Sequence, residues 1–216
     1  MEDIPKLTKC SLVTSFKCVE SVKMENVSKL GDLKALKEAV ERKKEEEEER
    51  RKEAEEAAKK TVVISCKRDW DCVDKRVGVV EVSDGCCNEE DLKELDLRGF
   101  VNLRELKVGN ECFEKVNEVK LIGLSELESV EIGMNSFTKF KNTWQITLDP
   151  NRHFYLKNCP KLKSLKMGRY SFSDYTVIEI ENVDALEVIE MGDLNDWSCN
   201  FYYASLELMS ILIHRE

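Results

Sequence analysis

Apolar residues recur at a regular spacing along the chain. A frame of the form Leu-x-x-apolar-x-apolar-Gly begins at Leu103 and returns at Leu127. It occurs again at Leu162, after a longer step, and more loosely at Leu186, where the step equals that between the first two copies. Alternation of apolar and polar residues over a few positions is typical of short strands. The frame therefore predicts one strand in every repeat.

A second apolar segment lies in each repeat. In the Leu103 frame, a small residue and then Phe113 follow the glycine, and six residues after Phe113 an alternating segment begins at Val119. The corresponding segments elsewhere begin at Leu95, Phe154 and Ile178. Each repeat thus predicts two straight segments joined by corners.

Two weaker copies extend the array. In the first copy, Val77, Val80 and Val82, followed by Cys86-Cys87, have the same spacing as Leu103, Leu106 and Val108, followed by Cys112-Phe113. Near the start, Ser15-Phe16 is followed six residues later by Val22-Lys23-Met24-Glu25-Asn26-Val27 and then by Leu30. The extra residues of the long step form an insertion near 141–151.

Repetition with a period of about 24 residues predicts an α/β repeat solenoid, in which stacked coils with parallel strands share one core. Gly and Asn recur at the corners, which predicts tight turns with positive φ. The residue before each Phe is small, which indicates close approach of neighbouring coils. The corner positions are Gly109, Gly133, Gly168 and Gly192 on one side, and Asn26, Gly99, Gly123, Asn158 and Asn182 on the other.

Charges alternate along the predicted stack. The outward position between the two strand apolars is Glu81, Lys107, Glu131, Lys166 and Glu190 in successive units. Parallel strands lie about 4.8 Å apart, so unlike charges would be neighbours. Each exposed pair stabilises by only about 0–1 kcal/mol, so we expect these pairs mainly to set register.

The pattern resembles leucine-rich repeat proteins. Leu103 to Val108 and Leu162 to Met167 carry the Leu-x-x-Leu-x-Leu core, and the Gly-x-x-small-Phe segment followed by Asn158-Cys159-Pro160 is similar to the BspA-like branch. The resemblance covers about 77–213 and a fragment at the start. It implies a leucine-rich-repeat fold and protein binding without naming a partner.

Residues 34–60 break the period and predict one long charged helix. The segment has no Gly or Pro, and Glu precedes Arg or Lys at i, i+4 in pairs such as Glu48–Lys52, the favourable orientation. A solvated single helix of about 40 Å is favoured. The second alternative is a coiled coil, whose apolar seam would start at Leu33, Leu36 and Val40, but no apolar residues continue that seam through the Glu-rich segment. The third alternative is disorder. The predicted division is 1–33 as a partial first repeat, 34–60 as insertion or linker, and 61–216 as the solenoid.

Composition narrows the classes of function. The 216 residues are 42 % hydrophobic and 36 % charged, with a net charge of −9, which disfavours a nucleic-acid backbone binder. No run approaches the roughly 18 apolar residues of a membrane span. The start lacks an apolar signal, and nine scattered cysteines fit reduced thiols, so a cytoplasmic protein is expected, with a secreted one lacking its signal as the alternative.

Motifs for chemistry are few. There is no paired Cys-x-x-Cys knuckle, no glycine-rich phosphate loop and no nucleophile motif beside His153 or His214, the only histidines. We therefore expect no enzyme, no metal and no cofactor. A redox or metal role for Cys66 and Cys72 is the alternative.

The predicted function is that of a non-enzymatic protein-interaction module. Its partner-binding residues would be the outward strand positions together with Trp144, which lies in the insertion. In the alternative interpretation, the insertion folds back on the core as a flap formed by Trp144, Ile146 and Leu148. A second hypothesis is a structural segment of a longer or self-associating array, because Leu206-x-Leu208 to Ile213 carries no polar cap. The proposed partner-binding residues are Glu105, Lys107, Glu131, Lys166, Glu190 and Trp144.

Overall fold

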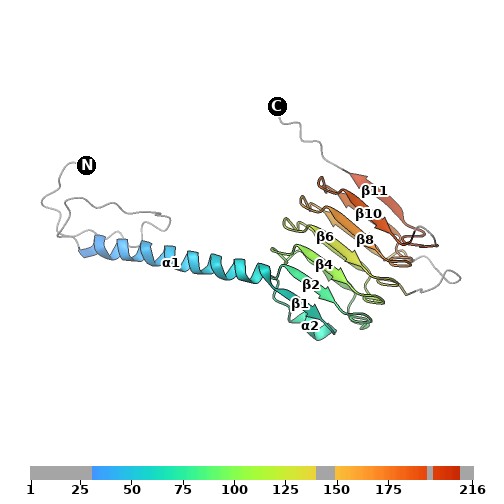
Figure 1. Ribbon diagram of the computed structural model, residues 1–216, viewed down its shortest axis with the longest axis horizontal. Coiled ribbons are helices and arrows are strands. Elements are labelled where there is room, and N and C mark those ends of the chain that lie inside the picture. Colours follow the sequence, from blue (N-terminus) through green and yellow to red (C-terminus); the bar gives the residue numbers. More distant parts are fainter. Residues whose placement is uncertain (1–30, 140–148, 194–196, 210–216) are drawn as a thin grey trace, which may run out of the picture. The chain divides into compact units, whose positions relative to one another are not determined.

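The computed structural model of the protein describes residues 31–139, 149–193 and 197–209, with side chains from residue 38 onward (Figure 1). The chain divides into two compact units, Met1–Glu55 and Glu56–Glu216. Most of helix α1 (Gly31–Lys59) belongs to the first unit, and every strand among the described residues belongs to the second.

Helix α1 covers the segment for which the sequence predicts a charged helix. Every side chain from Glu41 to Glu53 is exposed, as expected where no apolar residue occurs. Lys52 contacts Glu48 at 2.8 Å, the pair predicted from spacing. Arg51 instead contacts Glu55, four residues after it, at 3.5 Å. Arg51 has a glutamate four residues before it and another four residues after it, so it can pair with either one.

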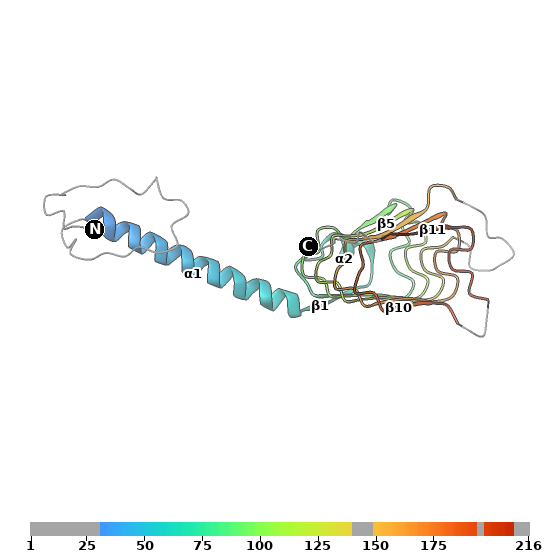
Figure 2. The same ribbon diagram turned by 90° about the horizontal axis from the view of Figure 1, so that it is seen from above.

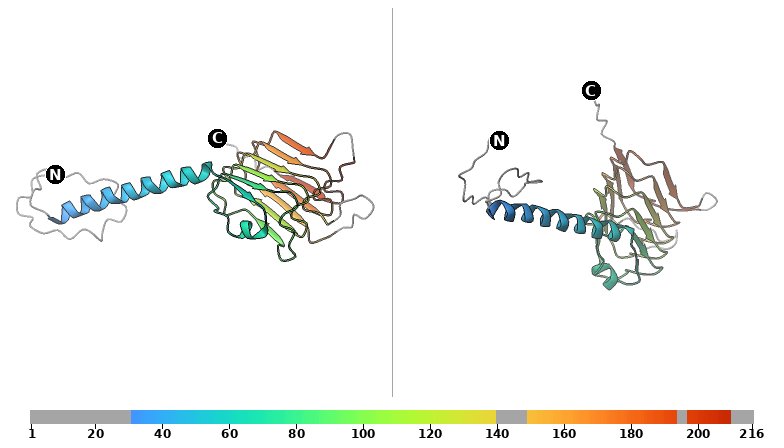
Figure 3. Two further views of the ribbon diagram at one scale, coloured as in Figure 1. Left: turned by 60° about the horizontal axis from the view of Figure 1, so that its bottom comes forward. Right: turned by 60° about the vertical axis from the view of Figure 1, so that its left-hand side comes forward.

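The second unit contains two parallel sheets, an α/β-type fold with few helices (Figures 1 and 3). The six-stranded sheet has the order β1 (Thr61–Ile64), β2 (Val79–Val82), β4 (Glu105–Val108), β6 (Ser129–Ile132), β8 (Ser164–Met167) and β10 (Val188–Met191). The five-stranded sheet has the order β3 (Glu94–Asp96), β5 (Glu118–Ile122), β7 (His153–Lys157), β9 (Val177–Glu181) and β11 (Ser205–Met209). A short helix, α2 (Lys67–Asp71), follows β1.

From β2 to β11 the chain alternates strictly between the two sheets. Figure 2 shows the sheets on opposite sides of flattened turns of chain. The register matches the predicted columns: Leu106 pairs with Val130, Val130 with Leu165, and Leu165 with Ile189. Residues that the period places in one column therefore lie side by side in neighbouring strands.

The core lies between the sheets and is organised in rows. Leu106, Val130 and Leu165 are at most 2 % exposed. A row of phenylalanine rings fills the corner of successive turns, with centroids 5.0 Å apart for Phe113–Phe137 and 4.7 Å for Phe137–Phe172. Apolar area buried this way is the main stabilising contribution, because one turn alone has no second face to pack against.

The structure corrects the prediction that all corner glycines have a positive φ. Gly123 has the expected positive φ of 71°, as do Asn158 and Asn182 at their corners. Gly133 and Gly168 do not; there, a Cβ would lie 2.6 Å from the carbonyl carbon of Gly109 and 2.5 Å from the amide nitrogen of Met134. Close approach of neighbouring turns, not backbone conformation, requires glycine in that column. Gly99 and Gly109 also lack a positive φ, Gly192 has one, and Asn26 lies outside the described residues.

The small residues before the phenylalanines do more than make room. Ser136 Oγ donates a hydrogen bond to the carbonyl of Gly109 at 2.7 Å, and Ser171 Oγ donates to that of Gly133 at 2.6 Å. Cys112 Sγ contacts the carbonyl of Ser83 in the same way at 3.0 Å. These bonds tie each turn to the preceding one and give partly buried carbonyls a hydrogen-bond partner.

Candidate functional site

Five of the six predicted partner-binding residues lie on the outer face of the six-stranded sheet. Lys107 stands between Glu81 and Glu131 in adjacent strands, and Lys166 between Glu131 and Glu190. Glu105 lies on the same strand as Lys107. Trp144, Ile146 and Leu148 lie outside the described residues, so both interpretations of Trp144 stay predictions.

Most charges of this face are paired within the protein. Lys107 Nζ lies 3.1 Å from Glu81 and 3.4 Å from Glu105, and Lys166 Nζ lies 3.2 Å from Glu190. The hydrogen bond to Glu81, then that to Glu105, raises the pKa of Lys107. A binding partner would have to compete with these pairs, which lowers the gain from new contacts here.

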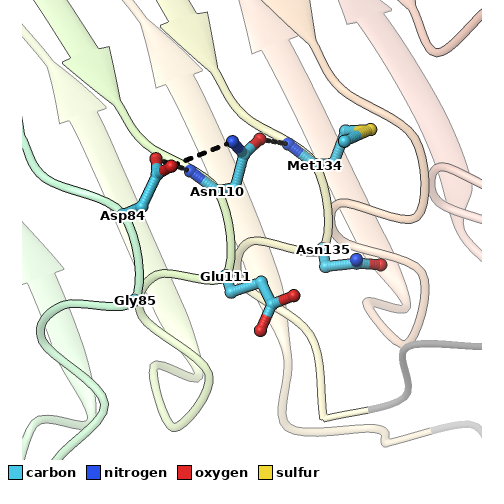
Figure 4. A pocket seen from close by; sticks show the side chains of 6 residues that line it. All are labelled: Asp84, Gly85, Asn110, Glu111, Met134 and Asn135. Atoms are coloured by element: carbon cyan, nitrogen blue, oxygen red, sulfur yellow. Dashed lines mark hydrogen bonds between the residues drawn. The ribbon is translucent and has the colours of Figure 1, made fainter.

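A shallow hollow lies where the turns after β2, β4 and β6 meet (Figure 4). The Asn110 amide donates to Asp84 Oδ1 at 2.7 Å, and the Met134 amide donates to Asn110 Oδ1 at 2.8 Å. These bonds pass from one turn to the next and hold the turns in register. The lining residues are Asp84, Gly85, Asn110, Glu111, Met134 and Asn135. This set contains no Ser, Thr, Cys or Lys nucleophile beside a general base.

The described cysteines are free thiols with contrasting environments. Cys66 and Cys72 flank α2 and are exposed. Burial raises the pKa of Cys87 to about 12 and that of Cys112 to about 11, so both thiols stay protonated near neutral pH. In the described part of the chain, no three His, Cys, Asp or Glu side chains gather to hold a metal ion.

His153 is held by two neighbours. Its Nδ1 lies 2.9 Å from the Tyr155 hydroxyl, and its Nε2 lies 3.0 Å from the carbonyl oxygen of Pro150. His214 lies outside the described residues. The contacts of His153 join the start of β7 to the segment before it and include no nucleophile.

A buried ion pair was missed by sequence analysis. Arg152 and Asp174 are both fully buried, and Arg152 Nη1 lies 3.0 Å from Asp174 Oδ1. Arg152 also donates to the carbonyls of Phe137 and Glu114. Burial raises the pKa of Asp174, while Arg152 opposes that shift. The only signal is that Arg152 directly follows the insertion near 141–151; nothing marks Asp174.

One end of the two sheets is covered. The Trp70 ring of α2 lies 5.9 Å from the Phe100 ring and 5.7 Å from the Phe113 ring, measured between centroids. Leu95 on β3, the edge strand of the five-stranded sheet, is 1 % exposed. The apolar interior is therefore closed at the β1 and β3 edges.

The opposite end exposes the interior row positions. Ile189 is 42 % exposed and Leu206 is 55 % exposed, whereas Leu165 and Ile178, their partners in the neighbouring strands, are at most 2 % exposed. We call this surface the open end. It comprises Ile189 and Met191 on β10 and Leu206 and Leu208 on β11.

Comparisons with models of known protein families, with curated proteins and with solved structures gave no match. The resemblance to leucine-rich repeat proteins therefore stays a prediction from the residues that carry it. Among the described residues, no helix is both long enough and apolar enough to cross a membrane.

Proposed function

We propose that this chain is a leucine-rich-repeat-like solenoid that serves as a non-enzymatic protein-interaction module and binds through the open end. The recurring apolar frame, the strict alternation between two parallel sheets and the in-register apolar rows support a solenoid. Exposed edge strands with an apolar face are templates on which another chain adds strands.

The exposure of the open end carries this proposal. Four side chains of the interior rows are between 38 % and 61 % exposed, although their row partners are buried. Covering each would contribute on the order of 1 kcal/mol, because complete burial of such a side chain is worth about 1.5–3 kcal/mol. Backbone hydrogen bonds to β10 and β11 would add to this gain.

The charges of the open end indicate which charge its partner strand should carry. Glu190 and Glu207 occupy the central outward positions of β10 and β11, and both are exposed. Cross-strand neighbours of opposite charge are favourable, as in the Lys166–Glu190 pair at 3.2 Å. The partner strand should therefore alternate apolar residues with a basic residue between them.

Site-specific photo-cross-linking tests the proposal. A photo-reactive residue at Leu208 should cross-link one defined protein in the producing cell, and the purified complex should be lost in Ile189→Lys. The same photo-reactive residue at Val101, which is 60 % exposed but lies away from the open end, is the matched control. Equal cross-linking at both positions, or a complex that survives Ile189→Lys, would contradict binding at the open end.

The outer face of the six-stranded sheet is a second candidate. Its support is the regular row of charges at 40–57 % side-chain exposure in Glu105, Glu81, Lys107, Lys166 and Glu190. Triple replacement of Lys107, Glu131 and Lys166 should then remove the partner. Retention of the same partner would leave the open end as the binding surface.

A further inference from the structure

The N-terminal sequence contains half of a repeat beyond those that form the described sheets. Ser15-Phe16 matches Ser171-Phe172, and the following residues match 178–186 at the same spacing. The matched apolar positions are Val22, Met24, Val27 and Leu30, and Asn26 matches the corner residue Asn182. This segment thus has the residue pattern of one further strand of the five-stranded sheet together with its corner.

We propose that residues 15–30 of one chain occupy the open end of a second copy, where they add a strand to β11. This inference rests on the proposed function and names its partner. Val22 and Met24 would cover Leu206 and Leu208, the positions that are 55 % and 61 % exposed. Phe16 would extend the row of stacked rings.

That row ends at Phe201. Its ring lies 4.9 Å from that of Phe172 at an interplanar angle of 6°. Phe201 keeps 9 % of its surface exposed, while Phe172 is fully buried. A ring added by the segment would have a prepared stacking position.

Charge complementarity supports the same register. With Val22 over Leu206, Lys23 stands beside Glu207, which has only the acidic Glu179 as its neighbour on β9. Lys157 already contacts Glu179 at 2.6 Å. Lys23 therefore supplies the basic residue that the row lacks next to β11.

The covered end does not offer an equivalent position. Leu95 and Leu97, on and beside the edge strand β3, are at most 1 % exposed, so a strand added there would bury little apolar surface. The open end is the only edge of the described sheets where the interior row positions are exposed on both sheets. Burial therefore selects β11 as the acceptor.

A second copy is favoured over the chain's own open end. Helix α1 ends at Lys59, and β1 begins at Thr61, at the edge of the six-stranded sheet opposite β10. The chain therefore enters the two sheets at the edge farthest from their open end.

Complementation between two full-length variants tests the proposal. The donor variant Val22→Lys/Met24→Glu keeps its open end, and the acceptor variant Leu206→Lys/Leu208→Glu keeps its N-terminal segment. Wild-type protein should assemble with increasing concentration in sedimentation velocity, and each variant alone should be monomeric. Mixed together, the two variants should form a one-to-one heterodimer, because one intact segment and one intact open end remain.

A charge exchange tests the register. Glu207→Lys should weaken assembly about two- to fivefold, and Lys23→Glu in the same chain should restore it. Val101→Lys, an equally exposed apolar position elsewhere, should assemble as wild type does. Circular dichroism and thermal unfolding establish that each variant is folded.

Three outcomes would overturn the proposal. Wild-type protein that stays monomeric at all concentrations excludes a second copy as occupant. Assembly that persists in the donor variant shows that another part of the chain fills the open end. A mixture of the two variants that forms no heterodimer shows that the intact segment does not bind the intact open end. Cross-linking at Leu208 to a different protein would still support the proposed function in each case.

Discussion

Removal of the charge at Asp174 should cost far more stability than removal of an equally close charge at the surface. The Arg152–Asp174 and Lys107–Glu81 pairs have nearly the same separation, 3.0 Å and 3.1 Å. The first pair is fully buried, whereas the second has side chains that are 45 % and 41 % exposed. The two pairs therefore differ chiefly in burial.

The magnitudes follow from desolvation. Asp174→Ala leaves the buried Arg152 guanidinium with only the more distant Asp149 carboxylate, 3.8 Å from Arg152 Nε, and losing one partner of a buried pair costs about 3–5 kcal/mol. Glu81→Ala leaves Lys107 beside Glu105 and water, so the cost should stay below about 1 kcal/mol. The double variant Arg152→Met/Asp174→Leu should recover much of the loss, because two apolar groups replace both charges.

Urea unfolding followed by circular dichroism measures these differences. The free energy of unfolding should fall by several-fold more in Asp174→Ala than in Glu81→Ala, with similar denaturant slopes. A double-variant cycle between Arg152 and Asp174 gives the coupling energy. Equal losses for the buried and exposed pairs, or a coupling energy near zero, would refute the desolvation reasoning.

Two further predictions concern the corners and the thiols. Gly133→Ala should lower the urea midpoint more than Gly123→Ala, because the first Cβ would lie 2.6 Å from the backbone of the preceding turn, whereas the second has free space and suffers only from its positive φ. In native protein at pH 8, a maleimide should modify the exposed Cys66 within minutes, and mass spectrometry should find Cys87 and Cys112 unmodified until the protein unfolds, because burial raises their pKa to about 12 and about 11.

Register was predictable from sequence because the same apolar frame marks the same row position in every turn. The step in sequence from Leu106 to Val130 is shorter than the step from Val130 to Leu165, yet both pairs lie in register in adjacent strands. Extra residues between two strands lengthen the step in sequence without changing the pairing of the flanking strands. Parallel pairing therefore preserved the register across residues 141–151.

The reason for each recurring column was harder to predict than the column itself. Glycine permits both positive φ and close approach, and the sequence pattern alone did not separate Gly123 from Gly133. Positive φ also occurs at residues with large side chains, such as Phe113 at 56° and Tyr170 at 61°. Stacking of the turns determines the backbone conformation at these positions, overriding the local preference of the residue.

The buried pair and the last stacked ring were missed for a different reason. Arg152 and Asp174 do not recur in the other repeats, so no repetition marks them. Each taken alone is a charged residue that would be predicted to lie at the surface. Phe201 continues the ring row after Phe172, but at a step in sequence that no other repeat uses. Sequence periodicity detects what the turns share and cannot detect contacts that a single turn makes.

Exposure at the open end is a property of position in the row and not of residue type. Leu165 and Ile189 pair in adjacent strands and are both large aliphatic residues, yet one is 0 % and the other 42 % exposed. The difference arises because Leu165 has a neighbouring strand on both sides, whereas Ile189 has one. A polar residue at Ile189 would lower the free energy of unfolding little, since the side chain is already partly hydrated, but would remove the apolar contact that an added strand requires. Substitutions at the open end should therefore separate binding from folding, which substitutions at Leu165 cannot do.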